Sequence, residues 1–209
     1  MRPPMRADTQ HAHPAADMQS AAQGPGASCN DKAADAQPVL QDMPGSLDIA
    51  GALADWDHDA DRVAVRIIRG DDHLPKMQMR LDLGLLQMET AGRPDGLRPH
   101  HFVSLLAYHM DRLEEHILQS GTPREFVLSP RDCRQLRDEA RMFSQRMLGW
   151  FVLGEWDLAE ADVQLVQQSM DFVRERATEP RDRGLLLGWK PYVTMMHARC
   201  RAAILVGDD

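Results

Sequence analysis

Features that define several protein classes are missing or scarce in this sequence of 209 residues. No apolar run approaches the roughly 18 residues of a membrane-spanning helix, which excludes that class. Only three cysteines occur, Cys29, Cys133 and Cys200, and they lie far apart, so neither a disulfide framework nor a paired-cysteine zinc motif is present. The first residues lack the apolar stretch of a signal peptide, and we expect a protein of the reducing cytoplasm.

Positive charge is also in deficit. Lys and Arg number 24 against 32 Asp and Glu, and the net charge of −8 argues against nucleic acid as a direct ligand. The phosphate-binding patterns GxxxxGK[ST] and GxGxxG are absent. Hydrophobic residues make up 43% of the chain, which is enough for one core if they are concentrated in part of it.

Aromatic residues are absent from the first part of the chain, where Trp56 is the first to appear. Residues 1–47 contain six prolines and ten alanines. Such a segment buries too little apolar surface to offset the conformational entropy of ordering it. We therefore predict a disordered tail over residues 1–47 and a single domain over residues 48–209.

Alternating apolar residues predict an antiparallel β-hairpin over residues 62–88. Val63, Val65 and Ile67 form one run, and the sequence Lys-Met-Gln-Met-Arg-Leu-Asp-Leu at residues 76–83 alternates without a break. The apolar positions change parity after Gly84, which suggests a β-bulge or sharp bend there. The apolar face of a lone hairpin must be covered by other elements.

Helical patterns follow and supply that cover. We predict helices at about residues 100–119, 130–153, 157–177 and 191–206, with Ser129 as an N-cap and a loop at residues 180–184. In the first of these helices, His109 lies on the apolar stripe, where we expect a hydrogen-bonded core histidine. The predicted fold class is α+β, mainly α, with the hairpin packed on about four antiparallel helices.

One pair of these helices carries a family-like pattern. Phe143, Trp150, Gly154-Glu155-Trp156, Ala159 and Val163 follow the order of large, aromatic, turn and small residues in a helical hairpin. Residues 143–173 thus resemble a tetratricopeptide (TPR) helix–turn–helix unit. Met147 stands where that family prefers a small residue, and no second copy of 34 residues is visible. The resemblance implies a helical hairpin of a type that often binds peptides.

A second pattern covers residues 78–89 and 92–96. It is similar to uncharacterised bacterial proteins, some of them labelled for the UVR motif, a helical hairpin shared by UvrB and UvrC. The end of that motif is matched by Leu136-Arg137-Asp138, whereas Cys133 and Arg134 replace its two alanines and Pro130 its aromatic residue. This resemblance implies a protein-docking element of the kind used in excision repair.

Metal-binding patterns are incomplete. Asp55, Asp57, Asp59 and Asp61 resemble the first half of a calcium loop, but Ala60 and Arg66 stand where such a loop needs Gly and Glu. Among the nine histidines no pair has the His-x-x-x-His spacing, and the adjacent His100 and His101 diverge on a helix. We assign no metal ligands and no cofactor.

Nucleophile patterns are equally weak. Ser104, Ser129 and Ser144 lie outside any nucleophile-elbow sequence, and we expect Cys133 and Cys200 to be packing residues. The pair Glu114-Glu115 lies on the polar side of its helix. We assign no catalytic residues, and an enzyme would need polar groups that converge in a pocket near His101 or His109.

One charged surface remains. Arg62, Arg66, Lys76 and Arg80 lie on the polar face of the predicted hairpin, where they either contact phosphate or acidic peptides or keep the strands from aggregating. We favour the second interpretation.

The leading hypothesis for the function is a non-enzymatic cytoplasmic scaffold that binds another protein, and the alternative is an accessory factor in DNA repair or nucleic-acid metabolism. The sequence does not indicate the partner or the oligomeric state.

Overall fold

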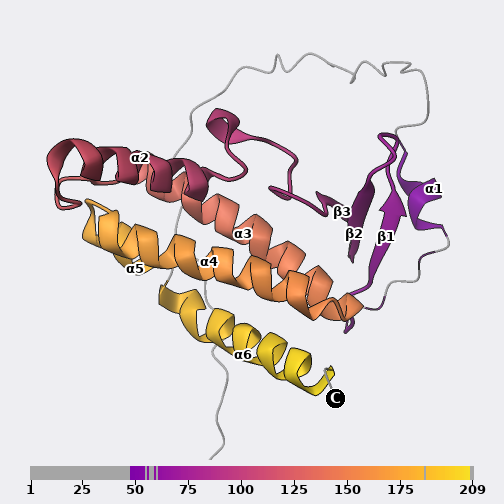
Figure 1. Ribbon diagram of the computed structural model, residues 1–209. Coiled ribbons are helices and arrows are strands. Elements are labelled where there is room, and N and C mark those ends of the chain that lie inside the picture. The colour runs from indigo at the N-terminus through magenta and orange to yellow at the C-terminus, as the bar shows by residue number, and fades with distance from the viewer. Residues whose placement is uncertain (1–47, 55, 57–58, 60, 186, 208–209) are drawn as a thin grey trace, which may run out of the picture. The chain divides into compact units, whose positions relative to one another are not determined.

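A short sheet precedes a set of helices in this chain (Figure 1). The structure is a computed structural model that describes residues 48–207 apart from residues 55, 57, 58, 60 and 186. The predicted tail at residues 1–47 lies outside these residues. The elements in chain order are α1 (Ala50–Leu53), β1 (Val65–Arg69), β2 (Pro75–Leu81), β3 (Gly84–Glu89), the 3₁₀ turn η1 (Pro99–His101), α2 (Leu105–Ser120), α3 (Pro130–Leu153), α4 (Trp156–Arg176), α5 (Pro180–Leu185), the 3₁₀ turn η2 (Leu187–Trp189) and α6 (Lys190–Gly207).

The sheet is antiparallel with the strand order β1-β2-β3. It confirms the hairpin but corrects its second strand, because the chain reverses at residues 82–83 instead of bulging at Gly84. The reversal pairs Met79 with Leu86 and Met77 with Met88, and directly paired residues face the same side of a sheet. The change of apolar parity after Gly84 therefore marks a tight turn.

The methionines of β2 cover the C-terminal half of α3. Met77 is fully buried, and a Cβ atom on Gly149 of α3 would lie 2.2 Å from the Met77 sulfur. This contact joins the sheet to the helices, as predicted for the apolar face of the hairpin. The expected apolar row does not extend further, because Leu81 is 46% exposed and Leu83 is 97% exposed.

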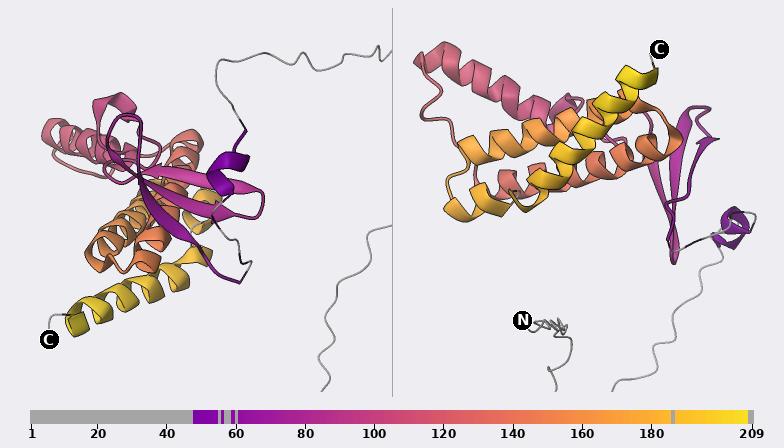
Figure 2. Two further views of the ribbon diagram at one scale, coloured as in Figure 1. Left: turned by 90° about the vertical axis from the view of Figure 1, so that its right-hand side faces the viewer. Right: turned by 90° about the horizontal axis from the view of Figure 1, so that it is seen from below.

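The helices α3 and α4 form an antiparallel hairpin, with α6 lying across α4 (Figure 2). Ser129 caps α3 and forms a reciprocal capping box with Asp132, as its sequence position predicts. Gly154 ends α3 with a φ of 79°, a left-handed conformation that glycine adopts without strain. The buried side of α6, formed by Val193, Met196 and Cys200, completes the core.

Two predicted boundaries were wrong. The helix expected from residue 100 begins at Leu105, because His100 and His101 adopt left-handed backbone angles that break the pattern. The loop expected at residues 180–184 is the short helix α5, in which Pro180 takes the first position and Asp182 accepts a hydrogen bond from Arg137 of α3. No helix in the described part of the chain is both long and apolar enough to cross a membrane.

Candidate functional site

The position of α2 is set by two acceptors at its N-terminus. Glu139 of α3 is fully buried and accepts hydrogen bonds from the backbone N–H groups of Leu105 and Leu106, at 2.6 and 2.9 Å. The Ser104 hydroxyl accepts a third from Ala107. A carboxylate at this end also interacts favourably with the helix dipole. Burial raises the pKa of the Glu139 carboxyl, although the two backbone donors and Arg93 act in the opposite direction.

The rest of α2 is sparsely packed. Its buried residues, Leu105, Leu106 and His109, all lie in the first half of the helix. Met110, also in the first half, is 49% exposed, and in the second half Ile117 is 37% exposed and Leu118 is 81% exposed. Such a contiguous apolar surface on a helix is typical of a binding site.

A groove of about 740 Å³ follows this side of α2, and we call it the α2 groove. Its lining residues come from the segment between η1 and α2, from α2 and from the end of α4: Phe102, Ala107, Met110, Asp111, Leu113, Glu114, Ile117, Leu118 and Phe172. Seven of these nine residues are apolar, the two polar ones are both acidic, and none is basic. The groove therefore suits an apolar ligand with positive charges at its edge.

Aromatic contacts hold Phe172, the α4 residue that lines the α2 groove. Phe126, in the segment between α2 and α3, lies with its ring centroid 6.3 Å from that of Phe172 and 5.9 Å from that of His116. Phe126 is buried, and the neighbouring Leu128 forms a backbone bridge to Ala177 beyond α4. These contacts keep the C-terminal half of α2 beside the end of α4.

A buried ion pair joins the helices to the segment after the sheet. Arg146 of α3 donates two hydrogen bonds to Asp162 of α4, at 2.7 and 2.8 Å, and two more to the carbonyl oxygens of Glu89 and Gly92. Burial raises the pKa of the Asp162 carboxyl, and the Arg146 guanidinium opposes that effect. All these groups are used in holding the fold, so the pair is structural rather than reactive.

A polar cavity of about 500 Å³ lies beside β2 and β3. Two of its three cations are paired, since the Lys76 ammonium contacts Asp72 and Glu89, and Arg93 contacts Asp95 and Glu139, whereas Arg98 is exposed. The hydrogen bond to Asp72, followed by that to Glu89, raises the pKa of Lys76. Because Lys76 and Arg93 already have carboxylate partners, only Arg98 remains for an anion, and we assign no anion site to this cavity.

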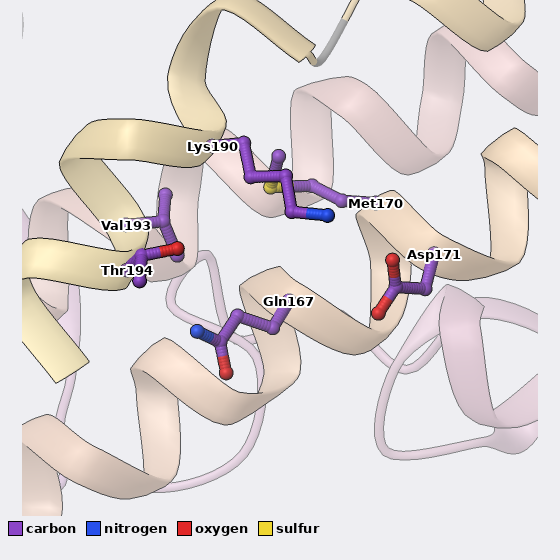
Figure 3. A pocket seen from close by; sticks show the side chains of 6 residues that line it. All are labelled: Gln167, Met170, Asp171, Lys190, Val193 and Thr194. Carbon is purple, nitrogen blue, oxygen red and sulfur yellow. The ribbon is translucent and has the colours of Figure 1, made fainter.

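A smaller pocket of about 230 Å³ lies between α4 and α6 (Figure 3). Met170 and Val193 form its apolar part, and the Lys190 amine points from α6 towards α4. Asp171 on the opposite side binds Arg174 at 3.0 Å. Lys190 and Asp171 are both exposed to solvent, so this pocket is a weaker candidate than the α2 groove.

The basic stripe predicted on the hairpin is largely engaged within the fold. The Arg66 guanidinium donates to Gln78 and to the Ala52 carbonyl and lies 4.0 Å from the centre of the Trp56 ring. Lys76 is bound as described above, and Arg80 donates to the carbonyl oxygens of Leu81 and Gly84. Three of the four basic side chains are thus bound within the fold, and Arg62 is exposed.

The candidate nucleophiles are placed in structural roles. Cys133 and Cys200 are fully buried, as predicted, and burial raises the pKa of the Cys133 thiol to about 11. Ser104 and Ser129 cap helices, and Ser144 is half-buried in α3. Thiolates and hydroxyls in these settings are poorly suited to attack a substrate.

The histidines that the structure describes do not converge on one site. His100 and His101 are exposed, and the His100 ring stacks on Tyr108 with centroids 3.9 Å apart. His109 is buried as predicted, but neither of its ring nitrogens has a hydrogen-bond partner among the described residues, so the expectation of a hydrogen-bonded histidine was wrong. The described residues contain no cluster of His, Cys, Asp or Glu that could hold a metal ion. Of the predicted calcium-like motif, Asp55 and Asp57 lie outside the described residues.

The residues behind the two family resemblances can be located. Phe143, Met147 and Trp150 of α3 and Ala159 and Val163 of α4 are all buried in the α3–α4 contact. In the UVR-like segment, Leu136 is fully buried and Arg137 binds Asp182 at 2.8 Å.

Comparisons of the chain with protein-family models, curated proteins and solved structures find no match. The α2 groove was not foreseen in the sequence. Its signal is the run Met110, Leu113, Glu114, Ile117 and Leu118, whose apolar stripe is wider than the contact with α3 requires.

Proposed function

We propose that this chain is a non-enzymatic protein-interaction protein, and that the α2 groove binds a helix of its partner. The observation that carries the proposal is the composition of the groove, which is apolar along its length and acidic at Asp111 and Glu114. The expected occupant is an amphipathic helix with an apolar stripe flanked by Lys or Arg. The TPR-like hairpin of residues 143–173 supports the same class of function, since hairpins of that type often bind peptides.

The first test uses a designed, fluorescently labelled helical peptide with leucines on one face and lysines beside them. We expect Leu118→Ser to weaken its binding about tenfold, since burying one leucine contributes about 1.5–3 kcal/mol. Leu83→Ser is the matched control, because Leu83 is also an exposed leucine, even more so than Leu118, but lies in the turn between β2 and β3. Fluorescence anisotropy at fixed ionic strength measures the dissociation constants. Equal weakening by both substitutions, or no binding to the unaltered protein, contradicts the proposal.

The second test addresses the charge at the rim. Glu114→Lys should weaken the lysine-flanked peptide about threefold to tenfold and strengthen a glutamate-flanked version, because it reverses one charge at the groove. Glu115→Lys is the control, since Glu115 is exposed on the same helix but does not line the groove. The difference between the two variants should shrink as salt is added. Identical effects of both variants would show that the peptide responds only to net charge.

A further inference from the structure

His109 is a buried titratable residue of α2, and its imidazole lacks hydrogen-bond partners among the described residues. The side chain is 1% exposed, and both ring nitrogens lie buried without a hydrogen-bond partner among the described residues. It lies one turn beyond Leu105, on the side of α2 that faces α3. A neutral imidazole tolerates this setting at a cost, whereas an imidazolium there would be a buried and unpaired charge.

The charged groups around His109 come from three elements. Arg112 of α2 and His100 of the η1 turn both disfavour a positive charge on His109. Asp132 at the start of α3 favours that charge. The Asp132 carboxylate is already engaged, because its Oδ2 atom accepts hydrogen bonds from the Ser129 backbone N–H and hydroxyl. The Tyr108 ring lies beside the imidazole with centroids 5.1 Å apart. This arrangement offers the imidazolium little compensation.

Because α2 has few buried contacts, it is the element most able to detach when His109 is protonated. Its three buried residues include His109 itself, and its C-terminal half has none. Helices with few buried contacts open at lower free energy than the global unfolding of their domain. Expelling a charged His109 would therefore release α2 and leave the more deeply packed α3–α4 hairpin in place.

We propose that His109 is a pH-sensitive latch, whose protonation releases α2 from α3 and dismantles the α2 groove. The release of α2 follows from the packing alone, and its consequence for partner binding rests on the function proposed above. In regulatory terms, the groove is available at neutral pH and is lost on acidification.

The direction of the effect follows from proton linkage. Burial lowers the pKa of His109 below its ordinary value of 6.5, so the opened state binds this proton more readily than the docked state does. The free energy that holds α2 therefore falls as the pH drops below about 6.5, and it levels off below the lowered pKa. Within that window, the population of opened α2 increases up to tenfold for each pH unit.

Hydrogen exchange of the protein without any peptide tests the latch. Protection factors of the amides of α2 and of the α3–α4 hairpin are measured from pH 7.5 to 5.0 and corrected for intrinsic exchange rates. We expect protection in α2 to fall up to tenfold per pH unit below about 6.5, with little change in the hairpin. His109→Leu should abolish this dependence, and His101→Gln, at an exposed position, should retain it.

His116 provides the competing explanation, since it lies two turns further on and its Nε2 atom is also buried without a partner among the described residues. His116→Phe should leave the pH dependence of α2 intact. The latch is wrong if that variant removes the dependence, if His109→Leu retains it, or if α2 and the hairpin lose protection together. If His109→Leu fails to fold, an NMR titration of the imidazoles in the unaltered protein decides instead. The latch requires that His109 takes up its proton over the same pH range in which the α2 amides lose protection. Peptide binding at pH 7.5 tests the groove separately.

Discussion

At the scale of single residues, α3 carries two buried charges that organise the surrounding chain. Glu139 and Arg146 lie two turns apart, and both contact the segment that leads from the sheet to α2. Each is satisfied by backbone groups as well as by an oppositely charged side chain. Hydrogen bonds to charged groups contribute more than neutral ones, and removing one partner leaves the other buried and unpaired.

Glu139→Gln should lower the free energy of unfolding by about 1–3 kcal/mol. The carboxylate offers two acceptor oxygens to two N–H groups, whereas the amide of glutamine offers one acceptor and sets a donor against the other N–H. Urea unfolding measures the loss. Asp138→Asn serves as the control, because Asp138 is 54% exposed and its pair with Arg141 lies on the surface, where such pairs contribute about 0–1 kcal/mol. A loss no larger than that of the control would contradict this account of how α2 is held.

Such buried pairs could not be predicted from the sequence. Glu139 accepts hydrogen bonds from N–H groups that lie 33 and 34 residues earlier in the chain, and no local sequence pattern links those positions. The same applies to His109. Its burial follows from the apolar stripe, but its lack of hydrogen-bond partners in the described part of the chain depends on the arrangement of three elements. Tertiary contacts decide these features, and one sequence shows only local ones.

At the scale of elements, local signals predicted the boundaries wherever they were complete. The expected helix at residues 130–153 coincides with α3, because Ser129, Pro130 and Gly154 are strong start and stop signals. The start of α2 was placed too early, because Ser104 was not recognised as its N-cap. The third strand was missed, since Asp82-Leu83 lacks the glycine or asparagine that usually marks a two-residue turn.

The contact between β2 and α3 yields a prediction at this scale. A Cβ at Gly149 would lie 2.2 Å from the Met77 Sδ and 2.9 Å from its Cε, so Gly149→Ala should displace a fully buried side chain at a cost of about 1–3 kcal/mol. That cost exceeds the gain of about 1 kcal/mol in helix propensity. In a Met77→Val background both obstructing atoms are gone, and the same substitution should stabilise the protein. Thermal unfolding of the four proteins in this cycle tests whether the sign reverses.

At the scale of the whole molecule, every described core residue lies between Met77 and Cys200. Ser46–Asp209 forms one compact unit. The sequence predicts a single domain from residue 48 onwards, because the aromatic residues begin at Trp56 and the alternating and helical apolar patterns follow it. The fold class was predictable for the same reason. The α2 groove was not, because it arises where α2 remains uncovered by the rest of the chain.

A chain that begins at Ser46 should therefore have the same thermal midpoint as the full chain. We expect a difference within about 2 °C, since 1 kcal/mol corresponds to roughly 2–4 °C for a domain of this size. Differential scanning calorimetry of both chains measures it. A fall of more than about 5 °C would show that residues 1–45 contribute to the stability of the unit.

The two buried cysteines have a practical consequence. Cys133 is a buried residue of α3 and Cys200 a buried residue of α6, and burial raises the pKa of both thiols. An alkylating reagent reacts with thiolate, so each sulfur stays unmodified until its own surroundings open. The rates at which Cys133 and Cys200 are alkylated would therefore report how often the surroundings of α3 and of α6 open. The native cysteines thus measure local opening without an engineered probe.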